Sequence, residues 1–248
     1  IATGLLALAG ALTLSPDPRA QTIAVGSKRF TESYILGEII TQTINRAGEV
    51  RAQHRQGLGN TAIVFAALKS GAIQVYPEYT GTIAFELMGL KQVPGLAELN
   101  VLLAARGLAA AVPLGFSNTY AMAMSESRAA ELGIRAISDL QRHPRLRLGL
   151  SQEFLNRQDG WPALRAAYGL PLSPTGLDHG LAYDALSRGK VDVIDVYSTD
   201  AQIKRHGLRV LADDRGFFPP YAALLVYRED LPRRYPRTPF RTCRTSLL

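Results

Sequence analysis

The chain has 248 residues, of which 47% are hydrophobic and 20% charged. This ordinary globular composition excludes a disordered or collagen-like chain, and the length is enough for one large domain or for two lobes with separate cores. The formal net charge is +7, but lysines and arginines are scattered and form no basic stripe with interleaved aromatic residues. We therefore expect no nucleic-acid partner.

The beginning of the chain predicts export from the cytoplasm. Residues 1–14 form an apolar run that is too short to span a bilayer, and Pro16, Pro18 and Ala20 follow it. This pattern is typical of the end of a signal peptide, with a buried N-terminal helix as the alternative. We predict a partial signal peptide at 1–20. The single cysteine, Cys243, leaves no lipid-anchor cysteine after the apolar run, so the expected location is the periplasm.

From residue 22 onward, short apolar runs alternate with segments of helical periodicity. Residues 22–26 predict a strand, and a helix with Thr31 as its N-cap is expected to end at Gly48. A second strand and helix follow, the helix closed by Gly71. The alternation predicts an α/β protein. The loop at 27–30 follows a strand, and ligands of open α/β sheets bind at the carboxyl ends of strands.

The middle of the chain predicts a division into two lobes. Two apolar runs, 110–116 and 119–124, are separated only by Ser117 and Asn118, which we interpret as a crossing from one lobe to the other. The α/β alternation then resumes, and an apolar strand at 221–227 returns to the first lobe. The predicted division is lobe one at 21–117, lobe two at 118–212 and a return to lobe one at 213–248. Short crossings of this kind form a hinge.

Several long motifs carry aromatic residues at turns or strand ends. They are YPEYTGT at 76–82, SNTYAMA at 117–123, DVYSTD at 195–200 and FFPPYAA at 217–223. A second set of motifs, which partly overlaps the first, contains, in chain order, GSKRFTES at 26–33, YPEYTGT, EFLNRQDG at 153–160, GLAYDAL at 180–186, DVIDVYSTD at 192–200 and DDRGFFPPYAALLV at 213–226. Through this second set the chain resembles, over residues 22–230, the glycine betaine/choline-type substrate-binding proteins of ABC transporters, an osmoprotectant-binding family.

The resemblance implies a fold and a function. The expected fold is a two-lobed periplasmic-binding-protein fold, type II-like, with the ligand in the cleft between lobes and two hinge crossings. The expected function is capture of a quaternary-ammonium solute, glycine betaine first, with choline, carnitine and proline betaine left open. The implied partners are an ABC permease and its ATPase. The protein is expected to be a monomer that contacts the membrane only through the permease, and no cofactor or metal is expected.

The resemblance also assigns site residues. It implies a box of four tyrosines around a trimethylammonium group, a set of residues that bind a carboxylate, and one further residue lining the box, where a relative can carry Asp. These are Tyr79, Tyr120, Tyr197 and Tyr221 for the box, Lys28, Thr82 and Arg157 for the carboxylate, and Asn118 for the lining position. The chemistry agrees, because a quaternary ammonium has no N–H and is best held by aromatic faces, whereas a carboxylate attracts charged donors.

Some of these residues have plainer interpretations. Lys28 has the alternative of a solvated loop lysine, and Arg157 that of a partner for Asp159. Tyr76 and Tyr183 are expected to pack against the scaffold, and the aspartates at 192, 195 and 200 are expected to cap and pack rather than to bind a metal.

Catalysis is not expected. The chain has no nucleophile elbow, zinc-binding helix, phosphate-binding loop or dinucleotide glycine motif, and its four histidines are scattered without a recognisable partner. A receptor or sensor domain with the same fold, for another small amine or amino-acid-like ligand, is the alternative function. The tail PRTPFRTCRTSLL at 236–248 has no helical period and departs from the resemblance after Arg228, so we expect a truncated or aberrant C-terminus.

Overall fold

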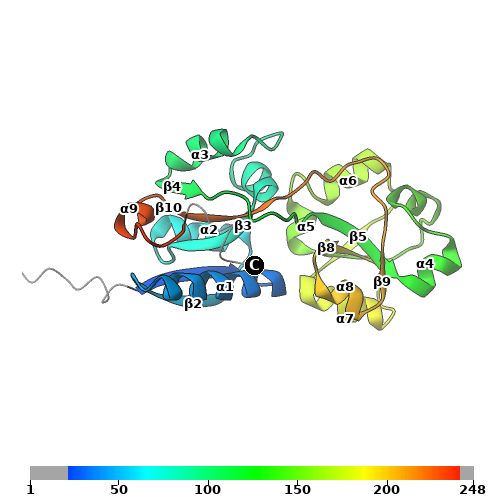
Figure 1. Cartoon of the computed structure of the whole chain (residues 1–248). Helices are drawn as coiled ribbons and strands as arrows, with labels where there is room; N and C mark the ends of the chain where they lie inside the picture. The colour runs from blue at the N-terminus through cyan, green and yellow to red at the C-terminus, as the bar shows by residue number, and fades with distance from the viewer. Residues whose placement is uncertain (1–21, 241–248) are drawn as a thin grey trace, which may run out of the picture.

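The computed structural model describes residues 22–240, and the predicted signal peptide and the last eight residues of the tail lie outside that range. Figure 1 shows two lobes side by side, each built of helices around its own sheet. The predicted two-lobed α/β fold is confirmed. Within residues 22–240, no helix is long and apolar enough to cross a membrane.

Lobe one contains a five-stranded sheet in the order β2-β1-β3-β10-β4. β1 pairs in parallel with β2 and β3, whereas β10 runs antiparallel to β3 and β4. The strands are β1 (Thr22–Lys28), β2 (Arg51–Gly59), β3 (Val75–Tyr79), β4 (Leu108–Ala110) and β10 (Ala223–Arg228). The helices are α1 (Thr31–Ala47), α2 (Thr61–Ser70), the π-helix η2 (Thr82–Leu87), α3 (Leu96–Ala104) and α9 (Leu231–Arg234).

The helix ends of lobe one follow local rules with one exception. α1 and α2 end at Gly48 and Gly71, whose φ angles of 68° and 79° are in the left-handed region that glycine tolerates. Asn60 caps α2 by accepting a hydrogen bond from the Ile63 amide at 3.2 Å. The predicted N-cap of α1 was wrong by one residue, because Phe30 is the extended cap residue and makes no side-chain cap bond.

Lobe two repeats the plan with the sheet order β7-β6-β8-β5-β9. β6 pairs in parallel with β7 and β8, and β5 runs antiparallel to β8 and β9. The strands are β5 (Tyr120–Ser125), β6 (Leu148–Ser151), β7 (Pro174–Leu177), β8 (Val193–Tyr197) and β9 (Leu208–Val210). The helices are α4 (Glu126–Leu132), the 3₁₀ helix η3 (Ile137–Arg142), α5 (Gln152–Asn156), α6 (Trp161–Tyr168), α7 (His179–Ser187) and α8 (Ala201–Arg205).

Two crossings join the lobes, one between β4 and β5 and the other between β9 and β10 (Figure 1). They lie against each other, because Ser117 and Ala222 form an isolated antiparallel bridge and the Thr119 hydroxyl donates to the Pro219 carbonyl at 3.1 Å. The carboxyl ends of β1 and β3 in lobe one and of β6 and β8 in lobe two lie near this junction, and their last residues line the cavities described below. The topology therefore gathers strand ends from both lobes around one cleft.

The chain after β10 packs on lobe one as far as the structure describes it. Leu231, Tyr235 and Phe240 are buried in the same cluster as residues of β1 and α1. The Glu49 carboxylate accepts hydrogen bonds from the backbone amides of residues 237 and 238, each at 3.0 Å. These contacts seal the outer end of the lobe-one core.

Candidate functional site

A small cavity lies between the lobes, and seven of the eight predicted site residues line it. The seven are Lys28, Tyr79, Thr82, Asn118, Tyr120, Tyr197 and Tyr221, joined by Phe30 and Glu153. Tyr79 and Tyr197 end strands β3 and β8, Tyr120 begins β5, and Tyr221 lies in the second crossing. The volume is about 20 Å³, which accommodates about one water molecule. A larger ligand enters this box cavity only if the rings separate.

The aromatic rings of the box cavity contact one another. The Tyr120 ring centre lies 5.2 Å from that of Tyr197 and 6.2 Å from that of Tyr221, the latter at an interplanar angle of 85°. Phe30 contacts Tyr197 at 4.9 Å. Burial raises the pKa of the Tyr79, Tyr120 and Tyr197 hydroxyls well above the usual value. The rings are therefore neutral phenols, which keep their electron-rich faces without carrying a charge.

Glu32 lies behind the cavity and holds two of its lining residues. The Tyr79 hydroxyl donates to Glu32, and the Asn118 amide nitrogen donates to the same carboxylate oxygen at 2.9 Å. Because a carboxylate only accepts hydrogen bonds, the amide nitrogen of Asn118 must be the atom that faces it. Glu32 thereby fixes the orientation of one ring and of the Asn118 side chain.

Lys28 is buried and paired. Its Nζ lies 2.7 Å from the Glu78 carboxylate and 3.4 Å from the Thr61 hydroxyl, and 5.2 Å from the centre of the Tyr79 ring. The side chains of Lys28 and Glu78 are 7% and 0% exposed, so the interpretation as a solvated loop lysine is wrong. An ammonium group has three N–H donors, and these contacts use two of them.

Arg157 lies beside the box cavity and is paired with Asp159, as the plainer interpretation supposed. Its Nε and Nη2 donate to the two carboxylate oxygens at 2.8 and 2.6 Å, and the Tyr221 hydroxyl donates to the same aspartate. The guanidinium carbon lies 5.4 Å from the centre of the Tyr120 ring. Burial opposes the charge of Arg157, but the surrounding oxygens, including Asp159, outweigh it and raise the pKa.

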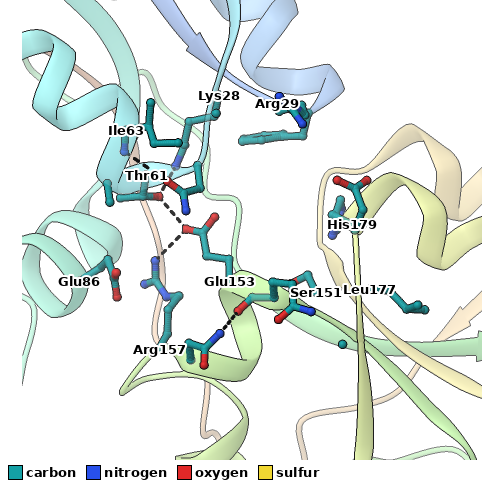
Figure 2. Close-up of a pocket in the computed structure, with 18 of the residues that line it drawn as sticks. Lys28, Arg29, Thr61, Ile63, Glu86, Ser151, Glu153, Arg157, Leu177 and His179 are labelled. Carbon is teal, nitrogen blue, oxygen red and sulfur yellow. Dashed lines mark hydrogen bonds and ion pairs between the residues drawn. The ribbon is translucent and has the colours of Figure 1, made fainter.

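A larger cleft of about 560 Å³ adjoins the box cavity and shares Lys28, Phe30, Glu153 and Tyr197 with it. Figure 2 shows this cleft, with Lys28 and Thr61 of lobe one facing Glu153 of lobe two. The Thr61 hydroxyl donates to the Glu153 carboxylate at 2.6 Å. This bond joins the lobes across the cleft. Arg157 lines the cleft rather than the box cavity.

Three residues of the site were not predicted from the sequence, and a fourth, Asp159, was predicted only as a partner of Arg157. Phe30 lines the box cavity, Glu153 lines both cavities, Glu32 supports two lining residues, and Asp159 binds Tyr221 as well as Arg157. All four belong to the motifs at 26–33 and 153–160 that supplied Lys28 and Arg157. The spacing of four between Glu153 and Arg157 on a short helix is the one local signal of their proximity.

Two of the aspartates that were expected to cap and pack make structural contacts. Asp195 accepts hydrogen bonds from the amide and hydroxyl of Ser151, at 2.6 and 2.7 Å, and Ser151 in turn caps α5. Asp192 pairs with Arg147 at 2.9 Å. Tyr76 and Tyr183 are buried in separate core clusters. The arrangement is that of a binding site, with converging rings and oriented donors on rigid strand ends.

Comparison with known proteins gives the family. Residues 21–238 match the substrate-binding domain of the ABC-type glycine betaine transport system. A glycine-betaine-binding protein of Pseudomonas aeruginosa is 35% identical, over 88% of this chain and 75% of that protein. An ergothioneine transport permease/binding protein of Helicobacter pylori is 34% identical over 93% of this chain, and the match spans 43% of the length of that protein.

Solved structures agree with the sequence match. A glycine betaine/carnitine/choline ABC transporter structure superposes with a TM-score of 0.66 and 28% identity, over 88% of this chain and 83% of that one. The substrate-binding proteins of ABC transporters deliver small-molecule ligands to a permease and are not enzymes. The chain belongs to the family of substrate-binding domains of ABC-type glycine betaine transport systems.

Proposed function

We propose that the chain captures a quaternary-ammonium solute in the box cavity and releases it to the permease of an ABC transporter. The observation that carries the proposal is the convergence of four tyrosines and Phe30, from both lobes and the second crossing, on one buried space. Glycine betaine is the first candidate, and choline, carnitine and proline betaine share its cationic group. We place the protein in the periplasm as a monomer whose permease is driven by its own ATPase.

The energetics support a ligand of this kind. Each ring that faces a cation contributes about 0.5–2 kcal/mol when water is excluded. Four rings therefore supply several kcal/mol, a large part of the roughly 8 kcal/mol that micromolar binding needs. The carboxylates of Glu32, Glu78, Glu153 and Asp159 outnumber the side chains of Lys28 and Arg157. Further out, the cationic His179 is itself paired with two aspartates, and Arg29 is balanced by Glu86 on the lining of the cleft. The net local charge therefore favours a positive ligand group.

The site offers the carboxylate of a ligand only a few hydrogen-bond donors. Lys28 keeps one N–H beyond its contacts with Glu78 and Thr61, and Thr82 lines the same cavity. Arg157 commits two nitrogens to Asp159 and points a third toward Glu153 at 3.5 Å. We infer that a ligand carboxylate shares these cations with the resident carboxylates. Because of this sharing, the ligand carboxylate adds little to the affinity, so we expect glycine betaine to bind with moderate affinity and choline, which lacks the carboxylate, to compete with it.

Binding requires the lobes to part and close again. The box cavity is too small for a trimethylammonium group in the structure described, and its walls come from both lobes. Rotation about the paired crossings opens it, and ligand contacts present only in the closed form shift the equilibrium back. A permease that recognises the closed form then receives loaded protein.

The test is isothermal titration of the mature protein with glycine betaine, choline, carnitine and proline. Ergothioneine, which the Helicobacter relative is named for, also carries a trimethylammonium group and joins the panel. We expect heat from at least one trimethylammonium ligand, none from proline, loss of binding in Tyr197→Ala and retention in Tyr197→Phe. Folded protein that binds none of these ligands would refute the proposal.

A further inference from the structure

His179 lies directly behind one wall of the box cavity. Its ring centre is 4.3 Å from that of Tyr197, at an interplanar angle of 31°. Tyr197 lines both the box cavity and the larger cleft, whereas His179 lines only the cleft. The Tyr197 ring thus separates the imidazole from the space that the four tyrosines surround, and one aromatic face is in contact with a titratable group.

Two aspartates hold the imidazole. His179 Nε2 lies 2.8 Å from the Asp200 carboxylate, and Nδ1 lies 3.9 Å from that of Asp195. Asp200 also accepts from the Tyr183 hydroxyl at 2.6 Å, and Asp195 is fixed by Ser151. Burial disfavours the imidazolium, but the two aspartates outweigh burial and raise the pKa of His179 to about 9. At neutral pH the group behind Tyr197 is therefore a cation.

The other charged groups near His179 come from several elements. Asp178 precedes it at the N-cap of α7, Tyr183 and His206 stack in the layer behind it, and the cleft it lines also carries five charged side chains. These five are Lys28, Arg29, Glu86, Glu153 and Arg157. Among the groups in direct contact with the imidazole, only the two aspartates carry charge, so its protonation sets the local charge to −1 or −2.

We propose that His179 is a positioning residue for Tyr197 whose positive charge opposes a cation bound at the opposite face of that ring. The inference rests on the proposed function of the box cavity. The imidazolium and a bound quaternary ammonium, on opposite faces of the Tyr197 ring, repel each other and compete for the same electron-rich π system. Loss of the imidazole proton removes the repulsion while the stacking contact is kept. By linkage, a bound quaternary ammonium must lower the proton affinity of His179.

The expected effect is modest for a zwitterion. The ammonium of glycine betaine is repelled by the imidazolium, but its carboxylate, a few ångströms further away, is attracted and offsets part of the repulsion. We expect glycine betaine to bind about threefold more tightly at about pH 10 than at about pH 7, because most of the imidazolium has lost its proton at the higher pH. Choline lacks the carboxylate and should show a larger ratio.

The experiment is titration calorimetry with glycine betaine and choline at both pH values, on wild type and on His179→Phe, which keeps an aromatic ring without charge. Comparing wild type with the variant cancels pH effects on binding that arise from groups other than residue 179. We expect the affinity ratio in wild type to exceed that in His179→Phe by about threefold. Equal ratios in the two proteins would overturn the proposal.

A second measurement on wild type keeps the proposal testable if His179→Phe does not fold. The pKa of the His179 imidazole, followed by NMR with and without saturating choline, should fall by about half a unit or more on binding. An unchanged or raised imidazole pKa in the complex would also overturn the proposal. Absence of binding by wild type at both pH values is a different result, because it refutes the proposed function of the box cavity itself.

Discussion

Glu78→Gln tests how Lys28 is kept as a buried cation. The pair is almost fully buried, with side-chain exposures of 7% and 0% and an N···O distance of 2.7 Å. Removing one partner of a buried pair leaves an uncompensated charge and costs about 3–5 kcal/mol. The amide oxygen that Glu78→Gln introduces and the Thr61 hydroxyl, at 3.4 Å, can still accept hydrogen bonds from Lys28, but neither carries the negative charge that compensates the ammonium group. Because each kcal/mol lowers Tm by about 2–4 °C in a chain of this size, we expect a decrease of about 6–20 °C.

The assay is thermal unfolding at neutral pH with and without ligand. A ligand carboxylate should partly replace Glu78, so glycine betaine should raise the Tm of Glu78→Gln by more than it raises that of wild type, and choline should not. Glu98→Gln makes the same chemical change at an exposed position of α3 and should leave Tm nearly unchanged. A Tm for Glu78→Gln within about 2 °C of wild type would refute the reasoning about the buried pair.

Three further variants and conditions probe the cleft, the box cavity and the proton site. Thr61→Val removes the bond to Glu153 that joins the lobes, and we expect about tenfold weaker glycine betaine binding by calorimetry, since hydrogen bonds to charged groups contribute about 1.5–3 kcal/mol. Gly81→Ala places a Cβ against the Tyr221 ring, so binding should weaken by about tenfold or more although the backbone, with φ of −64°, accepts alanine. The aspartates raise the pKa of His179 to about 9, so its protonation stabilises the folded state fully below about pH 6.5 and this stabilisation is lost as pH rises through 9. Urea unfolding should therefore show a free energy of unfolding that falls by up to about 3 kcal/mol over that interval.

Matched controls separate these effects from general damage. Thr61→Ser keeps the hydroxyl and should retain most of the affinity that Thr61→Val loses. Gly95→Ala adds a Cβ into open space at a similar φ of −63° and should bind as wild type does. His179→Gln lacks a titrating group, so its urea midpoint should stay level over the interval in which that of wild type falls. A variant that behaves like its control would count against the contact it was chosen to test.

The fold could be predicted from the sequence because it depends on local patterns: alternation of apolar runs and glycine-ended helices indicated the α/β architecture. Tyr79 and Tyr197 were assigned by the family resemblance that the long motifs carry, and the structure brings them together in one cavity. The N-cap of α1 was misplaced, because Thr31 is a good cap residue but the chain stays extended only to Phe30. Cap preference is a weak local energy that the packing around the Lys28 loop overrides.

What the sequence did not predict depends on contacts between distant segments. Glu32 meets Asn118 across 86 residues, and Thr61 meets Glu153 across 92. No local periodicity encodes such pairs, so the state of Lys28, buried and shared with Glu78, appeared only in the structure. The assignment of Arg157 to a ligand carboxylate stays a prediction, since its bidentate contact is with Asp159.

The most direct test of the account is a comparison of glycine betaine with 3,3-dimethylbutanoate, in which carbon replaces the quaternary nitrogen. The two ligands share shape and carboxylate, so contacts with Lys28 and Thr82 are matched and only the positive charge differs. If the tyrosine rings recognise a cation, titration of the wild-type protein should show at least about tenfold tighter binding of glycine betaine. Equal affinity for the two ligands would contradict cation recognition and leave the box cavity as a merely apolar pocket.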